Sequence, residues 1–229
     1  MKEKFTEIIK SDELQGISID LIEKVIDNEI TDEVLREVPI LKSLLAVRNA
    51  YNSYTDTIFI KKAMNVLLEL EETNWKQRVE LVSDLEDRYE TGAEKILMAI
   101  DKLETIEKCK VYGRLCKLKA LGKIKFTETF LRLTKLIQDA YLADLILVTE
   151  FKKGEKAKIH EADYYQIINL GLIYQEPSEQ TPIEKKPQHS EYDYEFQGGE
   201  IDFNYLLSDL GIDLLEIYYE LFPLDEDQR

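Results

Sequence analysis

The last third of the chain contains Tyr164-Tyr165-Gln166-Ile167-Ile168-Asn169-Leu170-Gly171-Leu172-Ile173, which predicts a helix that stops at Leu170-Gly171 and leads into a short strand. The segment from Ile201 to Leu207 alternates apolar and polar residues and predicts a second strand. Asp209-Leu210-Gly211-Ile212 then opens a closing helix. Two strands framed by helices indicate a small α+β module at this end of the chain.

The segment between these strands contains further strand signals. Tyr192, Tyr194 and Phe196 alternate with acidic residues, and Gly198-Gly199 follows them, which is typical of a β-hairpin turn. We expect Tyr194 to pair with Phe203 and the segment around Leu170–Ile173 to add a third strand. Three prolines and few aliphatic residues predict a mobile loop at about residues 175–199.

A helix, a strand ribbon and a closing helix in this order are typical of a winged-helix module. The sequence therefore predicts a mainly α protein, with a multi-helix body over residues 1–151 and a small winged-helix-like α+β module over residues 152–229. A winged helix that reads DNA would carry lysine or arginine on its reading helix, because phosphate neutralisation supplies much of the affinity. Here the corresponding helix carries Glu161 and Asp163 and has no basic residue after Lys158.

The body shows helical periodicity and capping signals. Thr91-Gly92-Ala93-Glu94 matches a capping box, Gly122 predicts a helix end, and Thr127 is the expected cap of the next helix. A further amphipathic helix is predicted with a buried stripe at Trp75, Val79, Val82 and Leu85.

Composition limits the classes of protein to consider. The 229 residues are 44% hydrophobic, as expected of a folded protein, and carry a net charge of −16, which disfavours nucleic acid and anionic membranes as partners. Cys109 and Cys116 are expected to be ordinary buried thiols in a reducing compartment. No membrane-spanning run or signal peptide is recognised, so we expect a cytoplasmic protein.

One segment is basic in this acidic chain. Between Lys102 and Lys135, the residues Lys110, Arg114 and Lys117 recur at helical spacing and form one stripe. Such a stripe could bind phosphate or an acidic partner. The alternative is a solvated face that carboxylates elsewhere in the fold balance.

The sequence offers no catalytic or metal-binding constellation. We expect Glu69, Glu71 and Glu72 to face water. His160 is a candidate general base, but it has no serine or cysteine nucleophile near it in sequence. We expect no enzymatic activity, cofactor or metal. The aromatic residues around Tyr192, Tyr194 and Phe196 are either part of a small core or an interface for a partner.

Two sets of residues resemble segments of known protein families. Segments including Val38-Pro39-Ile40-Leu41, Gly92-Ala93-Glu94-Lys95 and Tyr112-Gly113-Arg114-Leu115 resemble an uncharacterised family of small helical proteins of bacteria and their phages. Leu170-Gly171-Leu172-Ile173 and Leu207-Ser208-Asp209-Leu210-Gly211 are remotely similar to the abortive-infection alpha family, where the last segment usually reads Leu-Thr-x-x-Gly. The resemblance implies a role in phage defence and transfers no catalytic residue.

Together these observations favour a non-enzymatic protein-interaction or regulatory protein. Its candidate binding residues for a partner or phosphate are Lys110, Arg114, Lys117, Tyr192, Tyr194 and Phe196. Two alternatives remain open. One is a nucleic-acid-binding regulator that uses the winged-helix module. The other is an acidic mimic of nucleic acid that inhibits a basic enzyme.

Overall fold

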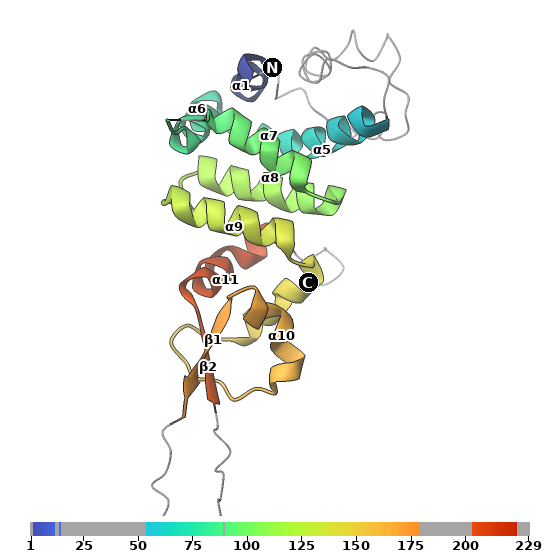
Figure 1. The fold of residues 1–229 in the computed structure, drawn as a ribbon. Helices are drawn as coiled ribbons and strands as arrows, with labels where there is room; N and C mark the ends of the chain where they lie inside the picture. The colour runs from blue at the N-terminus through green and yellow to red at the C-terminus, as the bar shows by residue number, and fades with distance from the viewer. Residues whose placement is uncertain (1, 12–13, 15–53, 89, 179–202, 224–229) are drawn as a thin grey trace, which may run out of the picture. The chain divides into compact units, whose positions relative to one another are not determined.

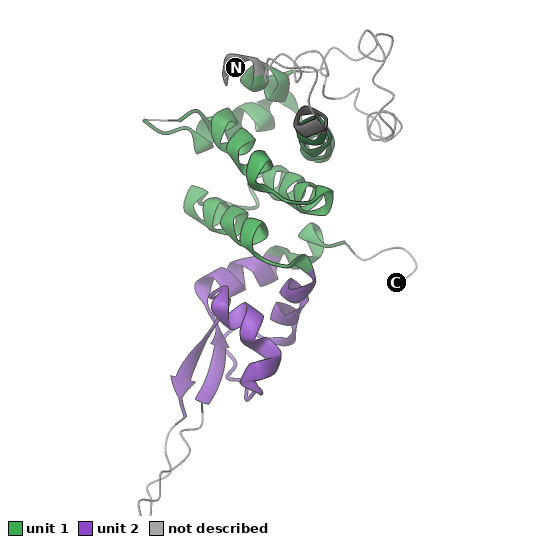
Figure 2. Cartoon of the chain, turned by 45° about the vertical axis from the view of Figure 1, so that its right-hand side comes forward, with its two compact units in different colours: residues 1–142, 217–229 green, residues 143–216 purple. Residues whose placement is uncertain are grey.

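The computed structural model describes residues 2–11, 14, 54–88, 90–178 and 203–223. The protein is mainly helical, with a small two-stranded antiparallel sheet near the C-terminus, as the sequence predicts (Figure 1). The chain forms two compact units, residues 1–142 with 217–229 and residues 143–216 (Figure 2). We call them unit 1 and unit 2 and describe each by itself.

The two units divide the chain at places other than the expected boundary after Phe151. Residues from 143 on already belong to unit 2, and within this unit the Phe151 ring meets that of Tyr164 edge-on, with centroids 5.6 Å apart. Residues from Ile217 on return to unit 1. The module expected over residues 152–229 stays a prediction.

Unit 1 is a bundle of helices. Its described helices are α1 (Lys2–Lys10), α5 (Tyr54–Glu71), α6 (Trp75–Leu85), α7 (Gly92–Lys102), α8 (Ile106–Ala120) and α9 (Thr127–Asp139). The capping box predicted at Thr91 is confirmed, since Thr91 and Glu94 each accept from the other's main-chain N–H. Asn74 and Gln77 form a second capping box at the start of α6.

Helix α8 lies at the centre of unit 1. It packs against α5 and α6 on one side and α9 on the other, and it is largely buried (Figure 1). Both cysteines lie on it and are buried as predicted. Burial raises the pKa of each thiol to about 12, so both thiols are protonated at neutral pH and are poor nucleophiles.

The buried stripe expected on α6 is wrong in part. Trp75 is 52% exposed, and the buried positions of α6 are Arg78, Leu81, Val82 and Leu85. The guanidinium of Arg78 is fully buried because it donates to the main-chain carbonyls of Ile9 at 2.9 Å, Ser11 at 2.9 Å and Thr73. A pattern based on hydrophobicity assigns such an arginine to solvent.

The expected cap at Thr127 is also wrong. Phe126 occupies the N-cap position of α9 without a side-chain hydrogen bond, and Thr127 is the first helical residue. Its hydroxyl donates instead to the main-chain carbonyl of Asp84 at 3.2 Å, at the end of α6. The predicted helix end at Gly122 is confirmed, since Gly122 has φ 74° and its N–H donates to Lys119 O.

Unit 2 contains the small sheet. Its elements are the 3₁₀ helix η2 (Leu142–Glu150), α10 (Glu161–Asn169), β1 (Ile173–Pro177), β2 (Phe203–Leu207) and the first turns of α11 (Asp209–Leu221). The strands pair antiparallel with Ile173 opposite Leu207 and Pro177 opposite Phe203, and Ala157 forms an isolated bridge with Tyr205.

The strand predictions succeed in part. The segment predicted over Ile201–Leu207 contains β2, whereas the segment predicted around Leu170–Ile173 contains only the first residue of β1. Strand β1 extends into the segment predicted as a loop from about residue 175. Residues 179–202 lie outside the described residues, so the predicted hairpin at Gly198-Gly199, the pairing of Tyr194 and the rest of the loop are not described. Phe203 pairs with Pro177 within the described sheet.

The two segments that carry the second resemblance meet in unit 2. Gly171 has φ 70°, which favours glycine at the stop of α10, and its carbonyl accepts from the Ser208 hydroxyl at 2.6 Å. A Cβ on Gly211 would lie 2.1 Å from the carbonyl oxygen of Leu172. These residues therefore fix the junction between α10, the sheet and α11, which is a packing role.

Among the described residues, no helix is long and apolar enough to cross a membrane.

Candidate interaction surfaces

The cationic stripe predicted from the sequence lies on α8. Lys110 is exposed, whereas Arg114 and Lys117 are partly buried against α5. The Nε of Arg114 lies 3.1 Å from a carboxylate oxygen of Glu69, and the Nζ of Lys117 lies 2.6 Å from one of Glu72. Two cations of the stripe thus have carboxylate partners inside unit 1, as the alternative interpretation expected of a balanced face.

Gly113 brings α8 close to α5 at this point. A Cβ there would lie 2.9 Å from the Cβ of Glu69 and 3.1 Å from the Cα of Val66, so a larger residue would push the helices apart. The close approach covers Glu69, whose side chain is only 17% exposed. The expectation that Glu69 faces water is therefore wrong, while Glu72 remains 64% exposed.

Burial also changes the chemistry of Glu69. Desolvation raises its pKa above the ordinary value of 4.5, although the charges of Arg114 and Lys117 act in the opposite direction. Arg114 is held by a second bond, because its Nη1 donates to the main-chain carbonyl of Leu221 at 2.9 Å. Arg114 therefore ties α5, α8 and the end of α11 together within unit 1.

These ion pairs line a cleft of about 470 Å³. A third pair, between Lys123 and Glu220, also lines it. Leu118, Leu121 and Tyr219 add apolar surface, and Leu121 and Tyr219 are 40% and 60% exposed. All lining residues belong to unit 1. The cleft therefore combines balanced charges with an apolar wall.

The sequence alone did not reveal this cleft. Its walls come from α5, α8 and the end of α11, which are far apart along the chain. The one signal was that Glu69 and Glu72 share the three-residue spacing of Arg114 and Lys117. Equal spacing does not identify which helices pack together.

In unit 2, α10 presents an open face. Of its residues only Ile167 is buried. Tyr164 holds the helix to η2, since its hydroxyl donates to the carboxylate of Glu150. The neighbouring Tyr165 is 59% exposed. The exposed residues of α10 are Glu161, Ala162, Asp163, Tyr165, Gln166 and Asn169.

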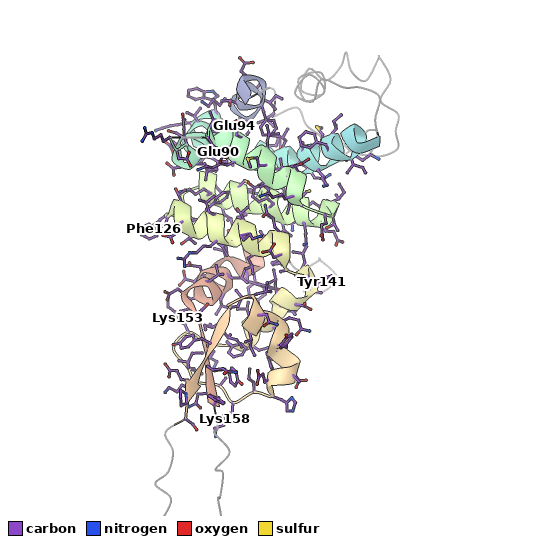
Figure 3. The ribbon with its side chains drawn as sticks, viewed as in Figure 1. Glu90, Glu94, Phe126, Tyr141, Lys153 and Lys158 are labelled. Carbon is purple, nitrogen blue, oxygen red and sulfur yellow. The ribbon has the colours of Figure 1, made fainter. Side chains whose placement is uncertain are left out.

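A short basic segment precedes α10. Lys152, Lys153, Lys156 and Lys158 are all exposed, and Figure 3 labels Lys153 and Lys158 in unit 2. Three of these lysines lie near carboxylates: Lys152 is 3.6 Å from Glu155, Lys153 is 2.8 Å from Glu216, and Lys156 is 3.1 Å from Glu176. The segment is accessible, but neighbouring acids offset much of its charge.

His160, the candidate general base, lies at the surface of unit 2. His160 is 80% exposed at the start of α10, with its Nδ1 3.9 Å from a carboxylate oxygen of Asp163. Among these residues, no group of three or more His, Cys, Asp or Glu side chains could hold a metal ion. Tyr192, Tyr194 and Phe196 lie outside the described residues.

No family model, curated protein or solved structure matches this chain.

Proposed function

We propose that this protein acts by binding another protein through the exposed face of α10. The observation that carries the proposal is the composition of that face. It combines an exposed tyrosine with Glu161, Asp163 and the amides of Gln166 and Asn169, and α10 contains no lysine or arginine. Exposed aromatic side chains are frequent energetic centres of protein interfaces, whereas a cation-free helix is poorly suited to phosphate.

The place of α10 in the fold supports this use. It directly precedes the first strand of a two-stranded ribbon, and α11 follows the second strand. We propose that this arrangement is winged-helix-like, with α10 at the position of the reading helix. The acidic charge of the helix favours a partner with a basic surface.

Matched tyrosine variants test the proposal. The crosslinking amino acid p-benzoylphenylalanine is placed at Tyr165 or, as a control, at Tyr141, which is 81% exposed and belongs to unit 1. We expect a single host protein to crosslink from position 165 and not from 141. Tyr165→Ala should abolish its co-purification, and Tyr141→Ala should leave it unchanged. Equal crosslinking from both positions, or none from 165, contradicts the proposal.

The resemblance to the abortive-infection alpha family is the basis for proposing a role in phage defence. That role is tested by the efficiency of phage plating on bacteria that express the chain or its Tyr165→Ala variant. We expect plating to fall with the parent chain and to recover with Tyr165→Ala. Equal plating with and without the chain contradicts a defensive role for the phages used.

A second candidate function is nucleic-acid binding through the lysines that precede α10. The exposure of Lys152, Lys153, Lys156 and Lys158 favours it, and the nearby carboxylates oppose it. It predicts an affinity for DNA or RNA that falls steeply with salt, measured by fluorescence anisotropy. Lys152→Glu with Lys156→Glu should then remove binding, and no binding at about 50 mM salt would exclude this function.

The distribution of acids weighs against a nucleic-acid mimic. Glu69, Glu72, Asp84, Glu176 and Glu220 each lie within hydrogen-bond or ion-pair distance of a lysine or arginine. A mimic needs a continuous row of unbalanced carboxylates. A cation balances each of these five acids instead.

A further inference from the structure

The cleft of unit 1 has features of a ligand site that are independent of α10. Its volume of about 470 Å³ falls within the range of small-molecule sites, which is about 300–1,000 Å³. Leu118, Leu121 and Tyr219 offer apolar and aromatic surface, and Tyr219 and Leu121 remain partly exposed to solvent. An apolar or aromatic body of small size would cover this surface.

The charges of the cleft differ in how firmly they are held. Lys117 is 21% exposed and its partner Glu72 is 64% exposed, so the cation is fixed more firmly than the acid. Arg114 is fixed twice, by Glu69 and by the carbonyl of Leu221. An incoming anion would displace Glu72 rather than Lys117, because the carboxylate of Glu72 is already largely hydrated. An incoming cation would have to displace the less exposed Lys117.

The remaining carboxylates oppose an anion only weakly. Glu69 is largely covered, and desolvation raises its pKa, so it ionises less readily than an ordinary glutamate. Glu220 is 42% exposed and pairs with the similarly exposed Lys123, so it can also turn towards solvent. Its departure would leave Lys123 for the ligand.

We propose that the cleft between α5, α8 and the end of α11 binds a small organic anion with an apolar or aromatic body. Lys117 and Lys123 contact its anionic group in place of Glu72 and Glu220. Leu121 and Tyr219 contact its apolar part. Arg114 positions the walls of the cleft and stays bound to Glu69 and Leu221.

Three probes of related chemistry test this site on the full chain. 8-Anilinonaphthalene-1-sulfonate has an aromatic body and one anionic group, and its binding is followed by fluorescence. N-Phenyl-1-naphthylamine has the same aromatic body without the sulfonate. Inorganic sulfate has the anionic group without the body and is used as a competitor. We expect the sulfonate dye to bind at one site and more tightly than its neutral analogue, and sulfate to compete weakly.

We expect lysine variants and glutamate variants to change the affinity for the sulfonate dye in opposite directions. Lys117→Gln and Lys123→Gln should each weaken binding of the sulfonate dye by about 3- to 10-fold, since each removes one charge-assisted contact. Glu72→Gln and Glu220→Gln should strengthen it several-fold, because they remove competing carboxylates. Lys110→Gln is the matched control, since Lys110 lies on α8 but does not line the cleft. It should change the affinity less than twofold.

Circular dichroism and the thermal midpoint of each variant show whether the fold is intact. The opposite signs for lysine and glutamate variants, with Lys110→Gln unchanged, support the anion site. The proposal is overturned if the dye does not bind, if Lys110→Gln acts like Lys117→Gln, or if both glutamate variants weaken binding. It is also overturned if the lysine variants weaken binding of the neutral analogue as much as binding of the sulfonate dye. The lysines would then affect the shape of the cleft and would not contact an anionic group.

Discussion

Unit 1 buries several of its cations, whereas the described lysines of unit 2 are exposed. In unit 1, the side chain of Arg78 is fully buried, and those of Lys108 and Lys119 are 8% and 2% exposed. Each of these side chains donates to a main-chain carbonyl. Lys108 donates to that of Gln138 at 2.7 Å, and Lys119 donates to that of Lys125 at 3.1 Å. In unit 2, the described lysines Lys152, Lys153, Lys156 and Lys158 are exposed.

This difference shows that basic residues in a sequence do not by themselves locate a binding surface. Many cations in the basic segment of α8 bind carbonyls and carboxylates of unit 1 and hold its helices together. The four described lysines of unit 2 are exposed, and exposed ion pairs contribute little to stability. The following predictions test this contrast.

The largest effect is expected for Arg78→Met. The change removes three donors to main-chain carbonyls and leaves buried acceptors without them, so we expect a loss of about 3 kcal/mol or more in the free energy of unfolding. Arg132→Met is the matched control, since Arg132 is 58% exposed and pairs with Glu128 on its own helix, and should cost about 0.5 kcal/mol or less. Urea unfolding measures both. Equal effects would contradict the structural role of Arg78.

The same substitution at a lysine in each unit should show a smaller contrast. Lys119→Met removes the ion pair with Asp84 at 2.9 Å and the bond to Lys125 O, and we expect it to cost about 1–2 kcal/mol. Lys152→Met, at a lysine 77% exposed, should cause no measurable change. Thermal unfolding compares the two variants. A larger loss from Lys152→Met would break the contrast.

Double-mutant cycles should give different coupling energies for an ion pair in unit 1 and an ion pair in unit 2. For Arg114 with Glu69, which are 27% and 17% exposed, we expect a coupling energy of about 1–2 kcal/mol. For Lys156 with Glu176, which are 55% and 40% exposed, we expect about 0.5 kcal/mol or less. Urea unfolding of the four alanine variants and the two doubles gives both energies. The reverse order would show that burial does not set the strength of these pairs.

The smallest effect is a pH dependence at Glu69. Its pKa is raised by burial in the folded state, so the folded state binds its proton more tightly than the unfolded state. The resulting stability is fully present below about pH 4.5 and is lost as the pH rises through the higher folded pKa. The parent chain should therefore lose stability relative to Glu69→Gln as the pH rises. Glu72→Gln controls for loss of a neighbouring charge just after α5, and a relative gain with pH would contradict the prediction.

Much of the architecture followed from local sequence signals. The capping box at Thr91 and the helix stops at Gly122 and Gly171 depend on residues close together in the chain, and all three were predicted correctly. The position of β2 followed from the alternation of apolar residues, whereas β1 lies later in the chain than the segment predicted for it. Local signals failed at Thr127, whose hydroxyl finds a partner in α6, and at Arg78, whose partners lie in α1 and before α6.

The sequence by itself determined that the protein is mainly helical, that its sheet is small and that α10 has no cation, because periodicity, capping and composition are local properties. Only the tertiary structure decided that Arg114 and Lys117 pair with Glu69 and Glu72 and that a cleft forms beside them. The physical reason is the close approach of α8 to α5 at Gly113, which brings distant charges together and sets their burial. The net charge of a segment can be summed from its sequence. The accessibility of each charged side chain, in contrast, depends on which helices pack against one another.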